Sequence, residues 1–293
     1  MSKKIPTYNL SNQLKSNFGF EFSKLEESYN TYDASSAHRH NYFELLYFIE
    51  EGGEHEIDFI SYPIKKNVFH FVSPEQVHQL RRNKNVTGFV FSFTSEFYLD
   101  DQTSLGFIDS IPFFDISIQQ QIINIEDSDY QKEILDSIVK IQKEYLSENI
   151  DKFELIRNYL SSLLILCRRL YKDTSIESKL SYHKSELTKK FKKLVEHHFK
   201  ENKSVSSYAL LLNITPGHLN DTIQKDTGKS ASEIIFERLI LESKRLLYHS
   251  SLSVKEISFE LNYDDPSHFT RFFKNQTNTT PEQFRMEIRE KYH

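Results

Sequence analysis

The sequence predicts an α+β protein of several domains: an N-terminal antiparallel β-barrel, a helical hairpin and a C-terminal all-α domain. Up to about Thr94, apolar and polar residues alternate in short runs rich in aromatic and β-branched residues. After about Asp127 the apolar residues recur at helical spacing. Beyond residue 185 the chain repeats itself. A chain of 293 residues can form more than one domain with its own core.

Alternating runs predict the strands of the N-terminal part. They cover residues 20–22, 42–51, 54–59, 67–72 and 87–93. Gly52-Gly53 separates two of the runs and predicts a hairpin turn there, because tight turns need backbone angles that glycine tolerates. Several short strands in series are typical of a small barrel or sandwich. We therefore assign residues 1–127 to a β-rich domain.

Two apolar stripes then predict a hairpin of two helices, broken near residues 148–151. The stripes consist of Ile134, Ile138, Ile141 and Tyr145, and of Ile156, Tyr159, Leu160, Leu163, Cys167 and Leu170. Their apolar face can pack on the barrel or pair with a second copy of the chain, and we expect self-association. Residues 172–185 are polar and unpatterned, which is typical of a linker. We assign residues 128–178 to a dimerisation segment and linker.

Composition indicates the compartment and the kind of partner. The one cysteine, Cys167, lies in an apolar run and predicts a buried thiol in a reducing compartment. Neither a signal-peptide-like start nor about 18 consecutive apolar residues occurs, so we expect a cytoplasmic protein with no membrane partner. Residues 179–293 carry 19 Lys and Arg against 15 Asp and Glu, whereas the rest carries 18 against 27. The small positive excess is compatible with a polyanionic partner and equally with an ordinary solvated surface.

The C-terminal region contains two copies of one supersecondary unit. Residues 205–214 match 254–263 at a shift of 49, and residues 219–228 match 269–278 at a shift of 50. Each copy predicts a serine-capped short helix, a turn at an asparagine, and a second helix with one polar face. The caps are Ser204 and Ser253, and the turn residues are Asn213 and Asn262. This pattern is a helix-turn-helix, and we assign residues 179–293 to a double helix-turn-helix domain.

A continuous helix of about 19 residues is predicted between the two copies. At roughly 1.5 Å per residue it spans about 28 Å. This length approaches the ~34 Å helical repeat of DNA. A rigid connector of that length could place both second helices in successive major grooves on one face of the duplex.

The C-terminal region resembles the AraC/XylS family of transcription regulators over residues 187–289. Its most specific stretch is SVKEISFELNYDDPSHFTRFFKNQTNTTPEQFR, residues 253–285. Asn262 and Asn278 stand where that family usually has glycine, and Ser258 where it prefers alanine. The N-terminal strands resemble the cupin-type sensor barrel often joined to this domain, and residues 129–172 resemble its helical dimerisation segment.

This resemblance implies a sequence-specific regulator, more often an activator, that binds double-stranded DNA. It also implies a small-molecule effector, a homodimer and contact with RNA polymerase as a further option. Exposed positions of the second helices are implied to meet the bases. Carried over by position, these are Gly217, Asn220 and Asp221 in the first copy, and Pro266, Ser267, His268, Thr270 and Arg271 in the second.

The chemistry of these side chains separates their expected roles. Arg271 can bond a guanine edge through two donors, and Asn220 can pair with adenine through a donor and an acceptor. Asp221 either accepts from a cytosine or lies off the DNA. Lys225 and Lys274, near the ends of the helices, are better suited to phosphate. Gly217 and Pro266 offer no side-chain hydrogen bond and permit close approach.

The segment HRHNYFE at residues 38–44 raises the separate question of metal chemistry. His38, His40 and Glu44 share parity, so a continuous strand would point them to one face, with alternate residues about 6.8 Å apart. His78, on a later strand, is a possible fourth ligand. Cupin enzymes bind iron, manganese or zinc with this kind of set.

The second cupin motif, however, is incomplete. In that motif a glycine normally follows shortly after the proline. One more residue also normally lies between the proline and the histidine than lies between Pro74 and His78. We therefore expect His38, His40, Glu44 and His78 to form an effector pocket with no metal and no other cofactor, in a protein that is not an enzyme. Three alternatives stay open: a structural or sensory metal at the same residues, a barrel that mediates protein contacts and binds no ligand, and a metal-dependent cupin enzyme with a helical C-terminal domain.

Overall fold

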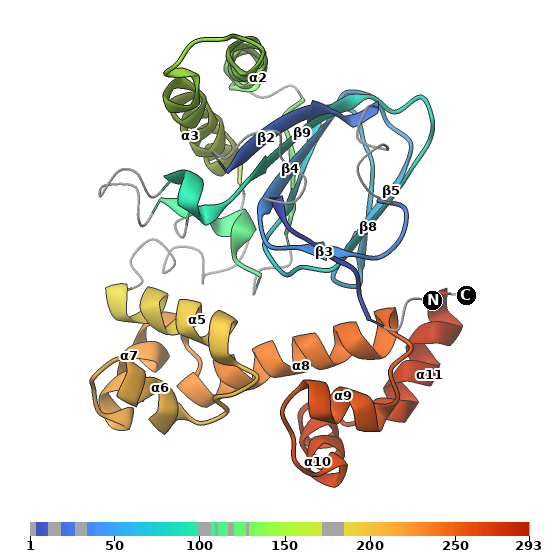
Figure 1. Cartoon of the computed structure of the whole chain (residues 1–293), viewed down its shortest axis with the longest axis vertical. Coiled ribbons are helices and arrows are strands. Elements are labelled where there is room, and N and C mark those ends of the chain that lie inside the picture. The colour runs from blue at the N-terminus through green and yellow to red at the C-terminus, as the bar shows by residue number, and fades with distance from the viewer. Residues whose placement is uncertain are drawn as a thin grey trace. The chain divides into compact units, whose positions relative to one another are not determined.

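The computed structural model describes residues 4–10, 19–26, 34–98, 107–108, 111–116, 120–126, 129–171 and 185–292. The chain divides into two compact units (Figure 1). The sheet unit comprises Pro6–Asp173, and the helical unit comprises Met1–Ile5 and Thr174–His293. The expected order, a β-rich N-terminal part followed by a helical C-terminal part, is confirmed. The expected linker at 172–185 lies, apart from Ser185, outside the described residues.

The strands of the sheet unit form three sheets. The largest is antiparallel, with the order β10 (Ile122–Asn124), β7 (Val68–Val72), β4 (Phe43–Phe48), β9 (Gly88–Phe93) and β2 (Phe20–Lys24). The second has the order β6 (Ile60–Pro63), β5 (Gly53–Ile57) and β8 (His78–Arg82), and the third pairs β1 (Thr7–Tyr8) with β3 (Arg39–His40). Two short 3-10 helices follow, η2 (Ser95–Tyr98) and η4 (Pro112–Phe114). Each predicted run contains one strand, but the described strands do not close into one continuous barrel.

Gly52 and Gly53 do not form the predicted hairpin turn. The strands on either side of them, β4 and β5, belong to different sheets, so the glycines carry the chain from one sheet to the other. Gly53 has φ +95°, and a Cβ there would lie 2.1 Å from the carbonyl oxygen of Arg81. Glycine is therefore required by this corner. The hairpin lies one strand later, where Asp58 and Phe59 take positive φ angles between β5 and β6.

Every residue of β4 is buried because the side chains on its two faces pack into two different cores. Leu45 and Tyr47 point into a core shared with the helical hairpin. Leu46 and Phe48 point into a second core shared with the three-stranded sheet. Because successive side chains face opposite sides of a sheet, one strand serves both cores.

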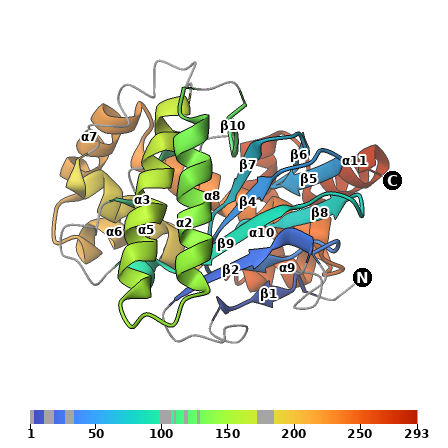
Figure 2. The same cartoon turned by 90° about the horizontal axis from the view of Figure 1, so that it is seen from above.

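The hairpin consists of α2 (Gln131–Tyr145) and α3 (Lys152–Leu170), which lie side by side over the five-stranded sheet (Figures 1 and 2). The predicted break between the helices is confirmed. Both apolar stripes pack inside the chain. Ile138, Ile141 and Leu160 belong to the core that contains the phenylalanines of β2, β7 and β9. The packing alternative is thus the one observed, and self-association through these stripes would require that core to open. Cys167 is buried, as expected, and burial raises the pKa of its thiol.

The helical unit begins with α5 (Glu186–His198) and then contains the two predicted helix pairs. These are α6 (Val205–Leu211) with α7 (Pro216–Thr227), and α9 (Val254–Glu260) with α10 (Pro266–Thr277). Between them lies α8 (Ala231–His249), and the chain ends with α11 (Pro281–Tyr292). The 19-residue length of α8 agrees with the prediction. None of the described helices is long and apolar enough to cross a bilayer.

Local sequence sets the boundaries of these helices. Ser204 and Ser253 cap α6 and α9 by accepting hydrogen bonds from backbone N–H groups three residues later, as predicted. Asn213 and Asn262 take left-handed backbone angles, with φ of 55° and 59°, in the turns that follow. Both turn predictions are therefore confirmed, and asparagine fulfils the role for which glycine is the commoner choice.

A buried ion-pair network anchors α8 to its surroundings. The carboxylate of Glu242 lies 3.3 Å from Arg238 and 3.5 Å from Arg245, and all three side chains are buried. Arg238 also forms an ion pair with Glu196 of α5 at 2.8 Å. The Glu242 pairs lie within α8 itself, and the pair with Glu196 joins α8 to α5.

Candidate nucleic-acid interface and buried histidine cluster

The two second helices, α7 and α10, are built alike. Each begins with a proline behind a capping side chain, Thr215 or Asp265, that accepts a backbone hydrogen bond. Each buries one pair of apolar residues four apart, Leu219 with Ile223 and Phe269 with Phe273. Each ends at a residue with positive φ, Gly228 or Asn278. Since only one stripe is buried, the opposite face of each helix remains exposed.

The exposed face of α10 carries most of the predicted base-reading residues. Ser267, His268, Arg271 and Lys274 are exposed. Thr270 is partly buried, and its hydroxyl donates to the carbonyl oxygen of Pro266. Among the described residues, the Arg271 guanidinium forms no hydrogen bond or ion pair, so its donors are available to a partner.

On α7 the structure separates the predicted residues. Asp221, Lys225 and Gly217 are exposed. A Cβ added at Gly217 would meet no other atom within 4 Å. Asn220 is different, because its Oδ1 accepts a hydrogen bond from the backbone N–H of Ala231 at 3.1 Å. The adenine pairing expected for Asn220 would use the same oxygen, which already accepts one of its two possible hydrogen bonds from the start of α8.

The other predicted cluster is assembled inside the sheet unit. Ligand atoms of His40, Glu44 and His78 all lie within 4.8 Å of one another, and all three side chains are buried. The strand is not continuous as expected: the chain bends at Asn41 and Tyr42 between β3 and β4. His38 joins the group because its backbone pairs with that of His78, with N–O distances of 3.0 and 2.9 Å.

Two further histidines, His55 and His70, extend this cluster, and neither was predicted from the sequence. His55 Nε2 lies 2.9 Å from His78 Nδ1, and His55 Nδ1 lies 3.2 Å from His70 Nδ1. Desolvation holds the pKa of His55 and of His78 well below the ordinary value, assisted by the neighbouring histidines, and lowers the pKa of His70 to about 3. All three rings are therefore neutral near pH 7. Their signal in the sequence was an inward-facing histidine on each of two alternating runs.

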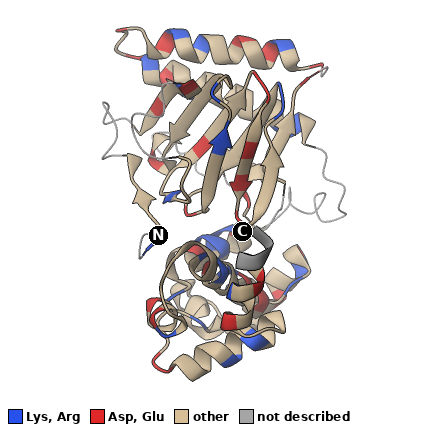
Figure 3. Ribbon diagram, turned by 90° about the vertical axis from the view of Figure 1, so that its right-hand side faces the viewer, with Lys and Arg blue, Asp and Glu red and all other residues tan. Residues whose placement is uncertain are grey.

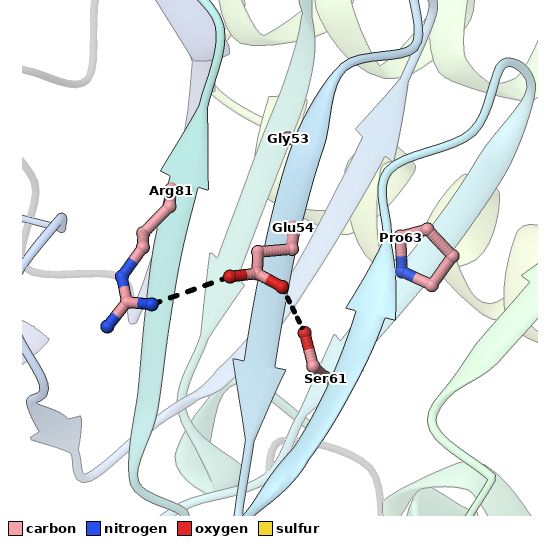
Figure 4. Close-up of a pocket in the computed structure, with 5 residues that line it drawn as sticks. All are labelled: Gly53, Glu54, Ser61, Pro63 and Arg81. Atoms are coloured by element: carbon pink, nitrogen blue, oxygen red, sulfur yellow. Dashed lines mark hydrogen bonds and ion pairs between the residues drawn. The ribbon is translucent and has the colours of Figure 1, made fainter. Parts of the chain in front are cut away.

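A surface hollow of about 590 Å³ lies elsewhere on the sheet unit, lined by Gly53, Glu54, Ser61, Pro63 and Arg81 (Figure 4). Glu54 occupies its centre, accepting from Ser61 at 2.6 Å and pairing with Arg81 at 3.4 Å. Neighbouring residues on a strand face opposite sides, so Glu54 points outward where His55 points inward. The hollow is thus separate from the histidine cluster.

A family model described as a helix-turn-helix domain matches residues 208–287, which span both helix pairs. Together with the exposed second helices, this match defines the class of the chain: a helix-turn-helix DNA-binding transcription regulator, and not a metal-dependent enzyme.

Known proteins of this class are similar to the chain. An HTH-type transcriptional regulator of Bacillus subtilis, YfiF, is 24% identical over 253 residues, covering 85% of this chain and 78% of its own. The Msm operon regulatory protein of Streptococcus mutans is 31% identical over 97 residues, or 33% of this chain and 35% of its own. The transcriptional activator RhaS of Salmonella schwarzengrund is 25% identical over 91 residues, covering 31% and 33%. The chain thus spans about a third of the latter two relatives.

Solved structures give weaker likenesses. ToxT from Vibrio cholerae covers 92% of this chain and 98% of its own at 12% identity, with a TM-score of 0.40. The C-terminal domain of AraT, a response regulator from Geobacillus stearothermophilus, covers 36% and 88% at 24% identity, with a TM-score of 0.34. Neither score supports a conclusion about this chain.

Proposed function

We propose that this regulator is a transcription activator that reads double-stranded DNA with α7 and α10 and responds to an effector in its sheet unit. The observation that carries the proposal is the pair of exposed second helices joined by the 19-residue α8. Because α8 is one continuous helix, the two second helices keep a defined spacing. That spacing suits successive major grooves of one duplex.

The base-reading role falls mainly to α10. Arg271 offers two donors to a guanine edge, and Ser267, His268 and Thr270 lie on the same helix as adaptable partners. Lys225 and Lys274, near the C-terminal ends of α7 and α10, suit phosphate contacts. On α7, Asp221 is exposed and can accept from a cytosine, and Asn220 can join where its oxygen accepts from a base in addition to Ala231.

The remaining partners extend this proposal. His38, His40, Glu44 and His78 form the effector site, since they lie together as buried polar groups inside the sheet unit. A homodimer would double the number of DNA-binding domains and raise affinity through effective concentration. If α2 and α3 mediate it, they do so with their outer surfaces, which carry charges of both signs (Figure 3). An activator of this kind would act in the cytoplasm and contact RNA polymerase.

Replacement of Arg271 by alanine tests the reading of DNA. Footprinting beside the protein's own gene first identifies a binding site. Arg271→Ala should then cost about 1–3 kcal/mol on that site and relax the preference at one base pair, with a smaller loss on a scrambled duplex. Asp221→Ala should leave affinity for the scrambled duplex unchanged or higher, because it removes a negative charge near a polyanion.

Lys140→Ala, an exposed change on α2, is the matched control and should bind as the wild type does. Titrations at two salt concentrations separate phosphate contacts from base contacts. Equal losses on both duplexes for Arg271→Ala would make Arg271 a phosphate ligand and contradict the assignment.

A further inference from the structure

We propose that the sheet unit binds one divalent first-row transition-metal ion through His40, Glu44 and His78, beside His38, and that His55 positions His78 for it. This reverses the metal-free pocket expected from the sequence. That expectation rested on the short spacing between Pro74 and His78. In the structure, the backbone pairing of His38 with His78 brings His78 to the cluster, although the segment from Pro74 to His78 is one residue shorter than the motif.

The ring orientation of His40 is the first argument. Its Nδ1 lies 2.7 Å from the carbonyl oxygen of Tyr42. A carbonyl oxygen only accepts, so Nδ1 must carry the proton, and the neutral ring then presents a bare lone pair at Nε2. His38 is held in the same way, with Nδ1 2.8 Å from the carbonyl oxygen of Ser36. Backbone carbonyls that fix the tautomer in this manner are a recurring feature around metal-ligating histidines.

The surroundings of these lone pairs are the second argument. Nε2 of His40 has no hydrogen-bond partner among the described residues and faces a Glu44 carboxylate oxygen at 3.8 Å. Nε2 of His78 likewise has none. The ligand atoms of His40, Glu44 and His78 lie within 4.8 Å of one another in a buried site, an arrangement that a cation placed between them would stabilise. That cation is either a proton or a metal ion.

The row of three histidines is the third argument, because it can supply His78 in the required form. If His78 Nδ1 donates to His55 Nε2, then His55 Nδ1 donates to His70 Nδ1, and His78 Nε2 faces the cluster as a lone pair. If the row runs the other way, His78 Nε2 carries a proton and cannot bind a metal. In either direction each ring donates one ring–ring hydrogen bond or its outer N–H, so each ring carries one proton and the two directions hold the same number of protons. Metal binding therefore selects one direction of the row.

The donor set indicates the kind of ion. Imidazole nitrogens with one carboxylate suit zinc, iron, nickel or copper, whereas magnesium and calcium prefer all-oxygen sites. The proposed metal site follows from this geometry and does not depend on the proposed function. Its identification as the effector site rests on the proposed function.

Cobalt(II) and zinc are the probes, applied to the full chain after removal of bound metal with a chelator. One equivalent of cobalt(II) should give visible absorption bands that zinc abolishes, and the zinc should remain bound through gel filtration. Glu44→Gln, nearly isosteric, should weaken binding more than 100-fold. Glu54→Gln is the control, because Glu54 lies on the outer face of the strand that carries His55 (Figure 4), and it should bind as the wild type does. Absence of the bands, or equal affinity of Glu44→Gln and wild type, would show that a proton alone occupies the cluster.

The role of His55 needs a readout that packing alone does not change. His55→Phe should lower affinity about 10–100-fold, the range for residues that orient a metal ligand, and His55→Gln, whose amide oxygen can accept the same bond, should restore part of it. Nitrogen NMR of the histidine rings should show His78 protonated on Nδ1 when zinc is bound. Equal losses in both variants, or a proton on His78 Nε2 with zinc present, would overturn the positioning role.

The effector role is tested separately by DNA titration with and without zinc. A change in affinity for the footprinted site that Glu44→Gln abolishes supports it. Zinc binding with unchanged DNA affinity overturns the effector role and leaves the metal site standing. Failure of the chain to bind any specific DNA would instead overturn the proposed function, and the cobalt spectra would still decide the site.

Discussion

An aspartate at Ile141 tests whether the hairpin of α2 and α3 belongs to the core of the sheet unit or to an interface between copies. Ile141 is fully buried in the same core as Phe22 and Phe91. Truncating a buried isoleucine costs about 2–5 kcal/mol. A carboxylate left unpaired in the same place costs several kcal/mol more. Against a typical total stability of about 5–15 kcal/mol, Ile141→Asp should leave the sheet unit largely unfolded.

Val139→Asp is the matched control, because Val139 lies two residues away on the same helix and is 60% exposed. Circular dichroism measures the folded fraction of each variant, and sedimentation velocity measures its mass. We expect Val139→Asp to keep the wild-type spectrum and Ile141→Asp to lose strand and helix signal. A folded Ile141→Asp chain with the mass of a monomer, beside a dimeric Val139→Asp chain, would refute the reasoning and restore the interface between copies.

Two further predictions concern the helical unit. Glu242→Gln should destabilise it by about 3–5 kcal/mol, because the buried Arg238 and Arg245 both lose their pair with this carboxylate, although Arg238 keeps its pair with Glu196. Glu237→Gln breaks only an exposed pair with Lys229 and should cost at most about 1 kcal/mol. Hydrogen exchange along α8 compares the two variants. Burial acts to raise the pKa of the Asp226 carboxyl, but the hydrogen bonds that it accepts from Ser185 and Thr188 together outweigh burial and hold the pKa below its ordinary value. Its contribution is therefore present at neutral pH and lost as pH falls through the lowered pKa, so Asp226→Asn should be less stable than wild type at pH 7 and approach it in acid; a difference independent of pH would contradict this.

Local features of the helical unit were predictable because their causes are local. A serine cap, an asparagine in a left-handed turn and a 19-residue apolar pattern each depend on a few neighbouring residues. Asn278 illustrates this, since it takes φ 63° where its counterpart in the first copy is Gly228 at 74°. Because the unit is repeated, the caps and turns recognised in one copy predicted those of the other.

Strand pairing was not predictable in the same way, because it is decided between segments distant in the sequence. Gly52-Gly53 has the composition of a hairpin turn, yet the flanking strands pair with other partners in separate sheets. For the same reason parity alone could assign His55 and His70 to an inward face but could not bring them together. Their contact depends on β5 and β7 facing each other across the core. An apolar stripe is equally ambiguous, since burial against a sheet and burial against another copy demand the same residues.

The unequal chemistry of α7 and α10 now has a structural cause. Both helices expose one face, but α7 also starts the next helix, because the Asn220 oxygen bonds the first backbone N–H of α8. The equivalent position in α10 is Thr270, whose hydroxyl bonds within its own helix. A base contact by Asn220 would therefore have to share an oxygen that α8 already uses, whereas Arg271 can offer all its donors to a base. Specificity should accordingly concentrate on α10, with α7 contributing spacing and phosphate contact through Lys225.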